Sequence, residues 1–176
     1  EPAFRVFALT ALSAMNDFAA YESLRELLSS SSAETRYGAF RSLWAMNCDD
    51  ALVRGEALDA QFSYHVLDVE GPPMVHVTRS RRPEVVLFGK EQQFKLPLAV
   101  EAGTQIMVTS ADSGEIHVSK YTVQEQDQKR IVSTSIDEVV RAVVELGGAY
   151  PDVVQMFQEA KASGALASRF EVDALP

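Results

Sequence analysis

A segment near the N-terminus is repeated further along the chain. Residues 5–16 read RVFALTALSAMN and residues 36–47 read RYGAFRSLWAMN, an offset of 31. A repeat of this period is typical of stacked helix–turn–helix repeats, in which each repeat buries its apolar face only against a neighbour. We therefore predict a stack of helices at the N-terminus. The identical positions are Arg5/Arg36, Ala8/Ala39, Leu12/Leu43, Ala14/Ala45, Met15/Met46 and Asn16/Asn47, and Leu9/Phe40 keeps the apolar character.

The spacing of apolar residues predicts three helices in this part of the chain. Apolar side chains three or four residues apart fall on one face of a helix over 2–16, 18–28 and 33–46. The predicted inner face of the first helix comprises Phe4, Phe7, Ala8, Ala11, Leu12 and Met15. On the third helix we expect three aromatic residues to pack toward the second helix and the rest of the protein, namely Tyr37, Phe40 and Trp44.

The motif Arg-x-x-Ala-x-x-x-Leu-x-Ala-Met-Asn, which begins at Arg5 and again at Arg36, resembles HEAT-type repeats. The resemblance implies an α-solenoid array of which residues 1–50 form the C-terminal end. The chain opens without Met and within a helical pattern, so we expect a fragment of a longer protein. The alternative is an unrelated helical hairpin followed by one helix.

From Gln61 the apolar period becomes that of a half-buried strand. Turn residues then separate short strands at a spacing of roughly ten residues, which is typical of an antiparallel barrel or sandwich. The predicted strands cover 62–67, 74–79, 83–88, 94–98, 105–109, 115–123 and 130–133.

The helical pattern returns after residue 134. Ser135 and Glu138 have the spacing of a capping box, and Gly147-Gly148 can end that helix in a left-handed conformation. Pro151 takes the favoured first position of the last helix. Residues 169–173 alternate like a strand, which we expect to return to the sheet because an isolated terminal strand is unstable.

These patterns predict an α+β protein. We expect a HEAT-like helical cap over 1–50, a linker over 51–60 and a β-rich module over 61–176. The β-rich module would be an antiparallel barrel or sandwich, completed by two C-terminal helices and the returning strand.

Composition narrows the functional classes. A net charge of −9 argues against nucleic acid as a partner, because phosphate binding needs a positive field. The single cysteine, Cys48, excludes an internal disulfide and a cysteine-based zinc cage. No apolar stretch approaches the roughly 20 residues of a membrane-spanning helix. The cell envelope or periplasm and the cytoplasm both stay open as locations.

Two clusters are candidate binding sites. Arg79, Arg81 and Arg82 could bind an anion or a partner, although such a cluster is also typical of a solvated turn. His65 and His76 lie on neighbouring predicted strands and could line a polar or metal pocket, whereas structural histidines are the commoner case.

The sequence contains no nucleophile elbow, phosphate loop or dinucleotide fingerprint, so we assign no catalytic, cofactor or metal residue. We therefore predict a non-enzymatic protein-interaction or scaffold module with an unidentified protein partner. The alternative is a β-barrel that binds a ligand or a metal and could be hydrolytic.

The second part of the chain also resembles the C-terminal region of large bacterial proteins described as flagellar P-ring-like. The resemblance rests on VTRSRRPEVVLFG at 77–89, VVELGGAYPDVVQ at 143–155 and RFEVDALP at 169–176. It implies a role in the assembly of the cell envelope.

Overall fold

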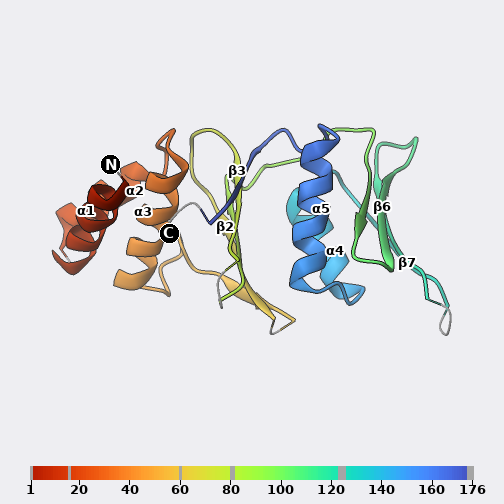
Figure 1. Cartoon of the computed structure of the whole chain (residues 1–176), viewed down its shortest axis with the longest axis horizontal. Coiled ribbons are helices and arrows are strands. Elements are labelled where there is room, and N and C mark those ends of the chain that lie inside the picture. Colours follow the sequence, from red (N-terminus) through yellow and green to blue (C-terminus); the bar gives the residue numbers. More distant parts are fainter. Residues whose placement is uncertain (1, 16, 60, 80–81, 123–125, 174–176) are drawn as a thin grey trace. The chain divides into compact units, whose positions relative to one another are not determined.

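The computed structural model describes residues 2–15, 17–59, 61–79, 82–122 and 126–173 (Figure 1). Over these residues the chain forms five helices and nine strands in two sheets. The α+β class is confirmed, and the described residues form no closed barrel. None of the described helices combines the length and the apolar character needed to cross a membrane.

The chain folds into two compact units. Unit 1 consists of Glu1–Glu56, Ser63–Lys90 and Glu171–Pro176, and unit 2 of Ala57–Phe62 and Glu91–Phe170. These limits differ from the boundaries at 50 and 61 that the sequence suggests. Each unit is therefore assembled from segments that are separated in the sequence.

Three helices open unit 1, namely α1 (Pro2–Met15), α2 (Phe18–Leu27) and α3 (Ala33–Met46). Helix α3 packs against both α1 and α2. The Ser42 hydroxyl donates to the carbonyl oxygen of Leu9 at 3.2 Å, which ties α3 to α1. The three predicted helices are thus present, within one residue of their expected ends.

Side chains at the helix starts explain where α2 and α3 begin. The Asp17 carboxylate accepts a hydrogen bond from the backbone N–H of Ala20 at 2.7 Å. The Ser32 hydroxyl accepts one from the backbone N–H of Thr35 at 3.2 Å. Each contact satisfies a backbone donor that has no partner within the helix.

Unit 1 also contains a mixed sheet with the strand order β1-β2-β4-β3-β9. β2 and β4 are parallel, whereas β3 and β4 are antiparallel, so the expectation of purely antiparallel pairing was wrong here. The unit boundaries fall within β1, β9 and the start of β2. β9 joins the sheet beside β3, which confirms the returning strand. The strands are β1 (Glu56–Leu58), β2 (Phe62–Leu67), β3 (Met74–Val77), β4 (Glu84–Phe88) and β9 (Arg169–Val172).

The core of unit 1 lies between the helices and one face of this sheet. Phe40 is fully buried and meets the Phe88 ring of β4 edge-on, at 6.3 Å between centroids. Tyr37 is also buried, which confirms the expected packing of these two aromatic residues. The main members of the core are Leu9, Leu24, Leu28, Ala39, Phe40, Leu43, Leu67, Met74, Val86 and Phe88.

Unit 2 contains an antiparallel sheet in the order β5-β6-β7-β8 and two helices. Burial alternates along β5 and over the first three residues of β6 and of β7, as expected for a sheet with one covered face, whereas no residue of β8 is buried. α5 packs against β5, and α4 packs against β7 and β8. The elements are β5 (Ala99–Ala102), β6 (Ile106–Ser110), β7 (Ile116–Lys120), β8 (Gln128–Val132), α4 (Ile136–Glu145) and α5 (Tyr150–Ala162).

Two local predictions in unit 2 were wrong. The predicted strand 94–98 is absent, and only isolated bridges form at Gln93 and Phe94. The expected capping box of α4 is also absent, because the Glu138 carboxylate accepts from the backbone N–H of Ser133 at 2.9 Å instead. The left-handed turn after α4 is confirmed by Gly147, whose φ is 87°.

Candidate functional site

The two candidate histidines lie in one row across the sheet of unit 1. His65 on β2 and His76 on β3 are both in register with Val86 on β4. The expectation that they occupy neighbouring strands was wrong, because β4 runs between β2 and β3. Both side chains are buried. The row therefore separates the two imidazoles by a strand instead of bringing them together.

Each histidine packs on a different aromatic ring of α3. The His76 ring stacks on Tyr37 at 3.7 Å between centroids. The His65 ring meets Phe40 edge-on at 4.9 Å. Both imidazoles thus pack between the sheet and α3, His76 by its face and His65 edge to face.

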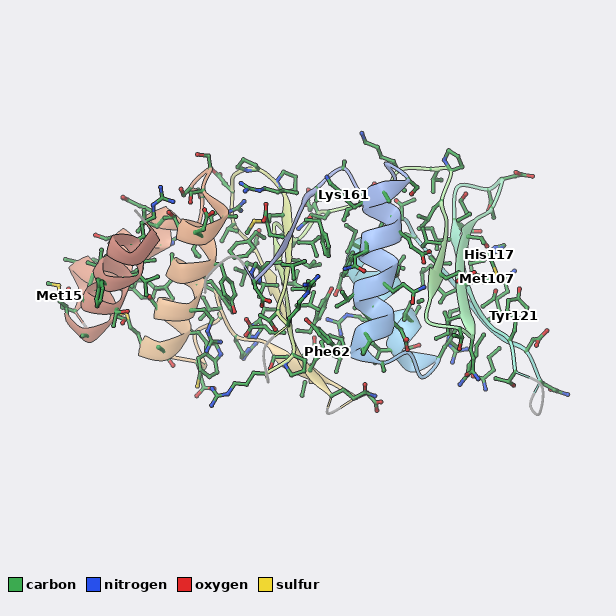
Figure 2. All side chains as sticks on the ribbon, viewed as in Figure 1. Met15, Phe62, Met107, His117, Tyr121 and Lys161 are labelled. Carbon is green, nitrogen blue, oxygen red and sulfur yellow. The ribbon has the colours of Figure 1, made fainter. Side chains whose placement is uncertain are left out.

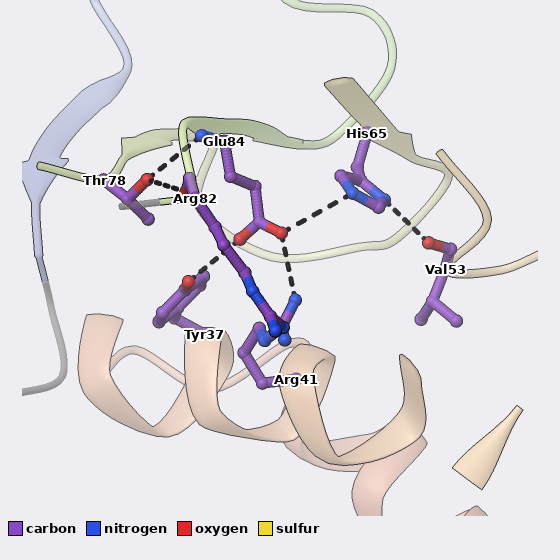
Figure 3. A network of polar contacts seen from close by, with 7 residues as sticks. All are labelled: Tyr37, Arg41, Val53, His65, Thr78, Arg82 and Glu84. Carbon is purple, nitrogen blue, oxygen red and sulfur yellow. Dashed lines mark hydrogen bonds and ion pairs between the residues drawn. The ribbon is translucent and has the colours of Figure 1, made fainter. Parts of the chain in front are cut away.

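A buried carboxylate links these aromatic contacts into a polar cluster (Figure 3). Glu84 lies two residues before Val86 on β4, and its side chain is only 7% exposed. The Tyr37 hydroxyl donates to Oε1 of Glu84 at 2.9 Å. Nη1 of Arg41 donates to Oε2 at 3.0 Å, and Nε2 of His65 lies 3.6 Å from the same oxygen. Sequence reasoning did not single out Glu84, because nothing local distinguishes it from a surface carboxylate.

The backbone around Glu84 is fixed by Thr78. The Thr78 hydroxyl accepts from the backbone N–H of Glu84 at 3.0 Å and donates to the carbonyl oxygen of Arg82 at 2.9 Å. This pair of hydrogen bonds holds the start of β4 beside the end of β3.

The orientation of His65 is set by its other nitrogen. Nδ1 lies 2.8 Å from the carbonyl oxygen of Val53. Because a carbonyl only accepts, Nδ1 must carry a hydrogen. Gly55 lies against the same ring, and a Cβ atom there would come within 2.4 Å of it. A glycine is therefore required at position 55 for His65 to keep this position.

Burial decides the charge of the cluster. It lowers the pKa of His65, although the Val53 carbonyl and the Glu84 carboxylate oppose that shift. It lowers the pKa of His76 to about 4. Burial and the adjacent Glu84 carboxylate raise the pKa of Tyr37. Near neutral pH, both imidazoles and the Tyr37 hydroxyl are therefore neutral, and Arg41 balances the charge of Glu84.

This arrangement is suited to holding α3 on the sheet. Within the described residues, no group of three or more His, Cys, Asp and Glu side chains could hold a metal ion. The oxygens of Glu84 are already engaged by Tyr37 and Arg41. The geometry therefore gives the polar cluster a packing role.

The candidate arginines follow β3 and precede β4 in the sequence. Arg79 and Arg82 are exposed, and Arg81 is outside the described residues. The backbone N–H of Arg79 donates to the Asp173 carboxylate at 2.8 Å. Anion or partner binding by Arg79, Arg81 and Arg82 stays a prediction.

Large apolar side chains are exposed on the first two helices. Phe7 is 74% exposed, Met15 61% and Phe18 78%. Met15 is labelled in Figure 2. The apolar spacing of α1 had suggested that Phe7 and Met15 face the core, which was wrong. Periodicity alone could not find this surface, because it marks an apolar face without saying what covers it.

A cavity of about 510 Å³ opens beside α2 in unit 1. Half of its lining residues carry carboxylates, and one of them, Asp68, pairs with Lys90 at 2.6 Å. Its lining residues are Glu22, Arg25, Glu26, Ser29, Leu52, Asp68, Val69 and Glu70.

In comparisons with known proteins, no protein family, no curated protein and no solved structure matches this chain.

Proposed function

We propose that this chain is a non-enzymatic protein-interaction or scaffold module that binds a protein partner through the first two helices of unit 1. The observation that carries the proposal is the exposure of Phe7, Met15 and Phe18. Contiguous exposed apolar surface marks interaction sites, and aromatic residues contribute most to binding energy. We take these three side chains to belong to one such surface.

Unit 2 offers a second surface. Met107 on β6 is 40% exposed, and Tyr121, which follows β7, is 52% exposed (Figure 2). Ile131 on β8 is exposed as well. A scaffold role would use both surfaces, one from each unit.

The geometry gives less support to a ligand-binding or hydrolytic barrel. That alternative needs His65 and His76 to converge, but β4 runs between their strands and each ring packs on an aromatic residue of α3. A role in the cell envelope rests on the resemblance of the second part of the chain to P-ring-like proteins.

The proposal is tested by affinity purification of partners from cells that produce the protein, with the full chain as bait. The Phe7→Ser/Phe18→Ser variant should reduce recovery of the specific partner at least about tenfold, as expected for the loss of a hot spot. Ile131→Ser changes an apolar side chain of unit 2 that is 57% exposed; it is the control and should retain the partner that binds the first two helices of unit 1. Undiminished binding by the double variant, or no specific partner at all, would contradict the proposal.

A further inference from the structure

Four residues spaced three or four apart form a stripe along α3, which we call the α3 stripe. Its members are Arg36, Ala39, Leu43 and Met46. The first three are buried, and Met46 packs against the core of unit 1. At this spacing the four side chains follow one another along one face of the helix.

Arg36 ties the start of the α3 stripe to the end of α2 and to the sheet, and the other members belong to or pack against the core of unit 1. Nε of Arg36 donates to the carbonyl oxygen of Leu28, directly after the last residue of α2, at 2.7 Å. The guanidinium carbon of Arg36 lies 4.8 Å from the centroid of the Phe88 ring on β4. Leu24 and Leu28 of the α2 segment belong to the same apolar cluster. Arg36, the first residue of the stripe, thus binds the C-terminal end of α2, while the other three residues pack in or against the core.

The same four residue types recur on α1, where most of them are more exposed to solvent. This α1 stripe consists of Arg5, Ala8, Leu12 and Met15. The Arg5 side chain is 50% exposed, whereas Arg36 is 2% exposed. Ala8 and Met15 are also exposed, and Leu12 is half-buried. Three of the four positions, Arg5, Ala8 and Met15, are therefore exposed on α1, whereas Leu12, like Met46 on α3, is half-buried and packs against the core of unit 1.

We propose that the α1 stripe binds an amphipathic helix of the α2 type, presented by the protein partner. Such a helix carries two leucines four residues apart, like Leu24 and Leu28, and ends near Arg5. The negative end of a helix dipole complements the Arg5 cation, as the end of α2 complements Arg36. The surface continues the packing already present between α2 and α3. This inference names the partner's structure and rests on the proposed function.

The present contacts of Arg5 leave it available for this role. Its Nη1 donates to the Ser32 hydroxyl at 3.1 Å and lies 3.8 Å from the Glu34 carboxylate. Exposed contacts of this kind contribute little to stability, because water and salt screen them. Arg5 can therefore exchange them for a helix carbonyl at a small energetic cost.

The test supplies the proposed helix within the same molecule. A second copy of residues 17–31 is placed directly before Glu1, which keeps the repeat offset of 31 because residue 32 aligns with residue 1. Covalent linkage raises the effective concentration of the added helix to the order of millimolar. If the helix binds the α1 stripe, backbone amides of α1 should exchange with deuterium at least about tenfold more slowly.

Two variants make the result specific. Leu24→Ser/Leu28→Ser in the added copy alone should abolish the protection of α1. Arg5→Gln with the unaltered copy should reduce it, because the helix end loses its cation. Fluorescence of the single tryptophan, Trp44 on α3, should not change and reports that unit 1 is intact.

The inference would be overturned if the added copy left the α1 amides unprotected. It would also be overturned if the copy that carries the two serines protected them equally well. The outcome is separable from the partner purification. Protection without any cellular partner would contradict the proposed function but keep the helix-binding surface. A partner lost on Phe7→Ser/Phe18→Ser, combined with no protection, would keep the function and reject an α2-type helix as its ligand.

Discussion

Glu84 is a charged side chain in the interior of unit 1. A buried carboxylate is tolerated only where charged and hydrogen-bonding partners replace the water that it loses. Arg41 supplies the opposite charge at 3.0 Å, and the Tyr37 hydroxyl donates to the other oxygen at 2.9 Å. Because Arg41 and Tyr37 belong to α3 and Glu84 to β4, these contacts fix the rotation of the helix over the sheet.

His76 should make the stability of the protein depend on pH. Burial lowers its pKa in the folded protein to about 4, from 6.5 for the ordinary side chain, while the Asp173 carboxylate opposes the shift. The unfolded chain therefore binds a proton between these values and the folded chain does not. Stability is full above about pH 6.5 and should fall by about 3 kcal/mol as the pH drops toward 4.

Urea unfolding at several pH values between 4 and 7 measures this dependence. His76→Phe keeps a ring against Tyr37 and removes the titrating group, so it should flatten the curve. A smaller slope in the same direction should remain from His65, whose pKa burial also lowers. An unchanged slope in the variant would show that His76 does not cause the pH dependence.

The sequence drew attention to two histidines without predicting their surroundings. His65 and His76 were candidates for a polar pocket; both side chains are buried, and each packs on an aromatic ring of α3. Their separation by β4 depends on strand order, which no local pattern encodes. Glu84 was not recognised, because its burial results from a helix that lies more than forty residues earlier in the chain.

At the scale of elements, local signals predicted the helices more reliably than the sheets. The predicted bounds 33–46 match α3, where Ser32 caps a run with helical apolar spacing. The predicted strand 94–98 is absent although its residues alternate in the right way. It has no continuous partner strand, and only isolated bridges form at Gln93 and Phe94. The parallel pairing of β2 and β4 was also missed, since it requires the chain to form β3 and return between the two.

The two serines before α3 and α4 should differ in their effect on stability. Ser32 accepts a hydrogen bond from the backbone N–H of Thr35, whereas the Ser135 side chain makes no capping hydrogen bond. Ser32→Ala should therefore lower the free energy of unfolding by about 1 kcal/mol, the usual effect of losing a cap. Ser135→Ala is the matched control and should change it by less than about 0.5 kcal/mol.

Chemical denaturation of both variants gives the comparison. Equal losses would mean that the capping contact of Ser32 does not stabilise α3. A larger loss for Ser135→Ala would show that its hydroxyl has a partner in solution that the folded geometry does not reveal.

At the scale of the whole molecule, the path of the chain connects the two units. Unit 1 takes its helices and inner strands from the first ninety residues but receives the end of β9 from the C-terminal segment. The backbone N–H of Asp173 donates to the carbonyl oxygen of Val77 at 3.0 Å, and the Asp173 carboxylate accepts from Arg79. The fold of unit 1 therefore depends on residues that follow all of unit 2 in the sequence.

A chain that ends after Ser168 lacks β9 and should leave β3 as an edge strand. Exposed strand edges pair readily with other chains, so this truncation should promote self-association as well as faster deuterium exchange in Met74–Val77. A chain that ends after Asp173 keeps β9 and both Asp173 contacts, and serves as the control. Analytical ultracentrifugation and hydrogen exchange compare the two chains. A shorter chain that stays monomeric, with full protection of Met74–Val77, would contradict this prediction. It would show that β9 is not needed to protect the sheet of unit 1, and that packing against α3 and the polar cluster around Glu84 is sufficient.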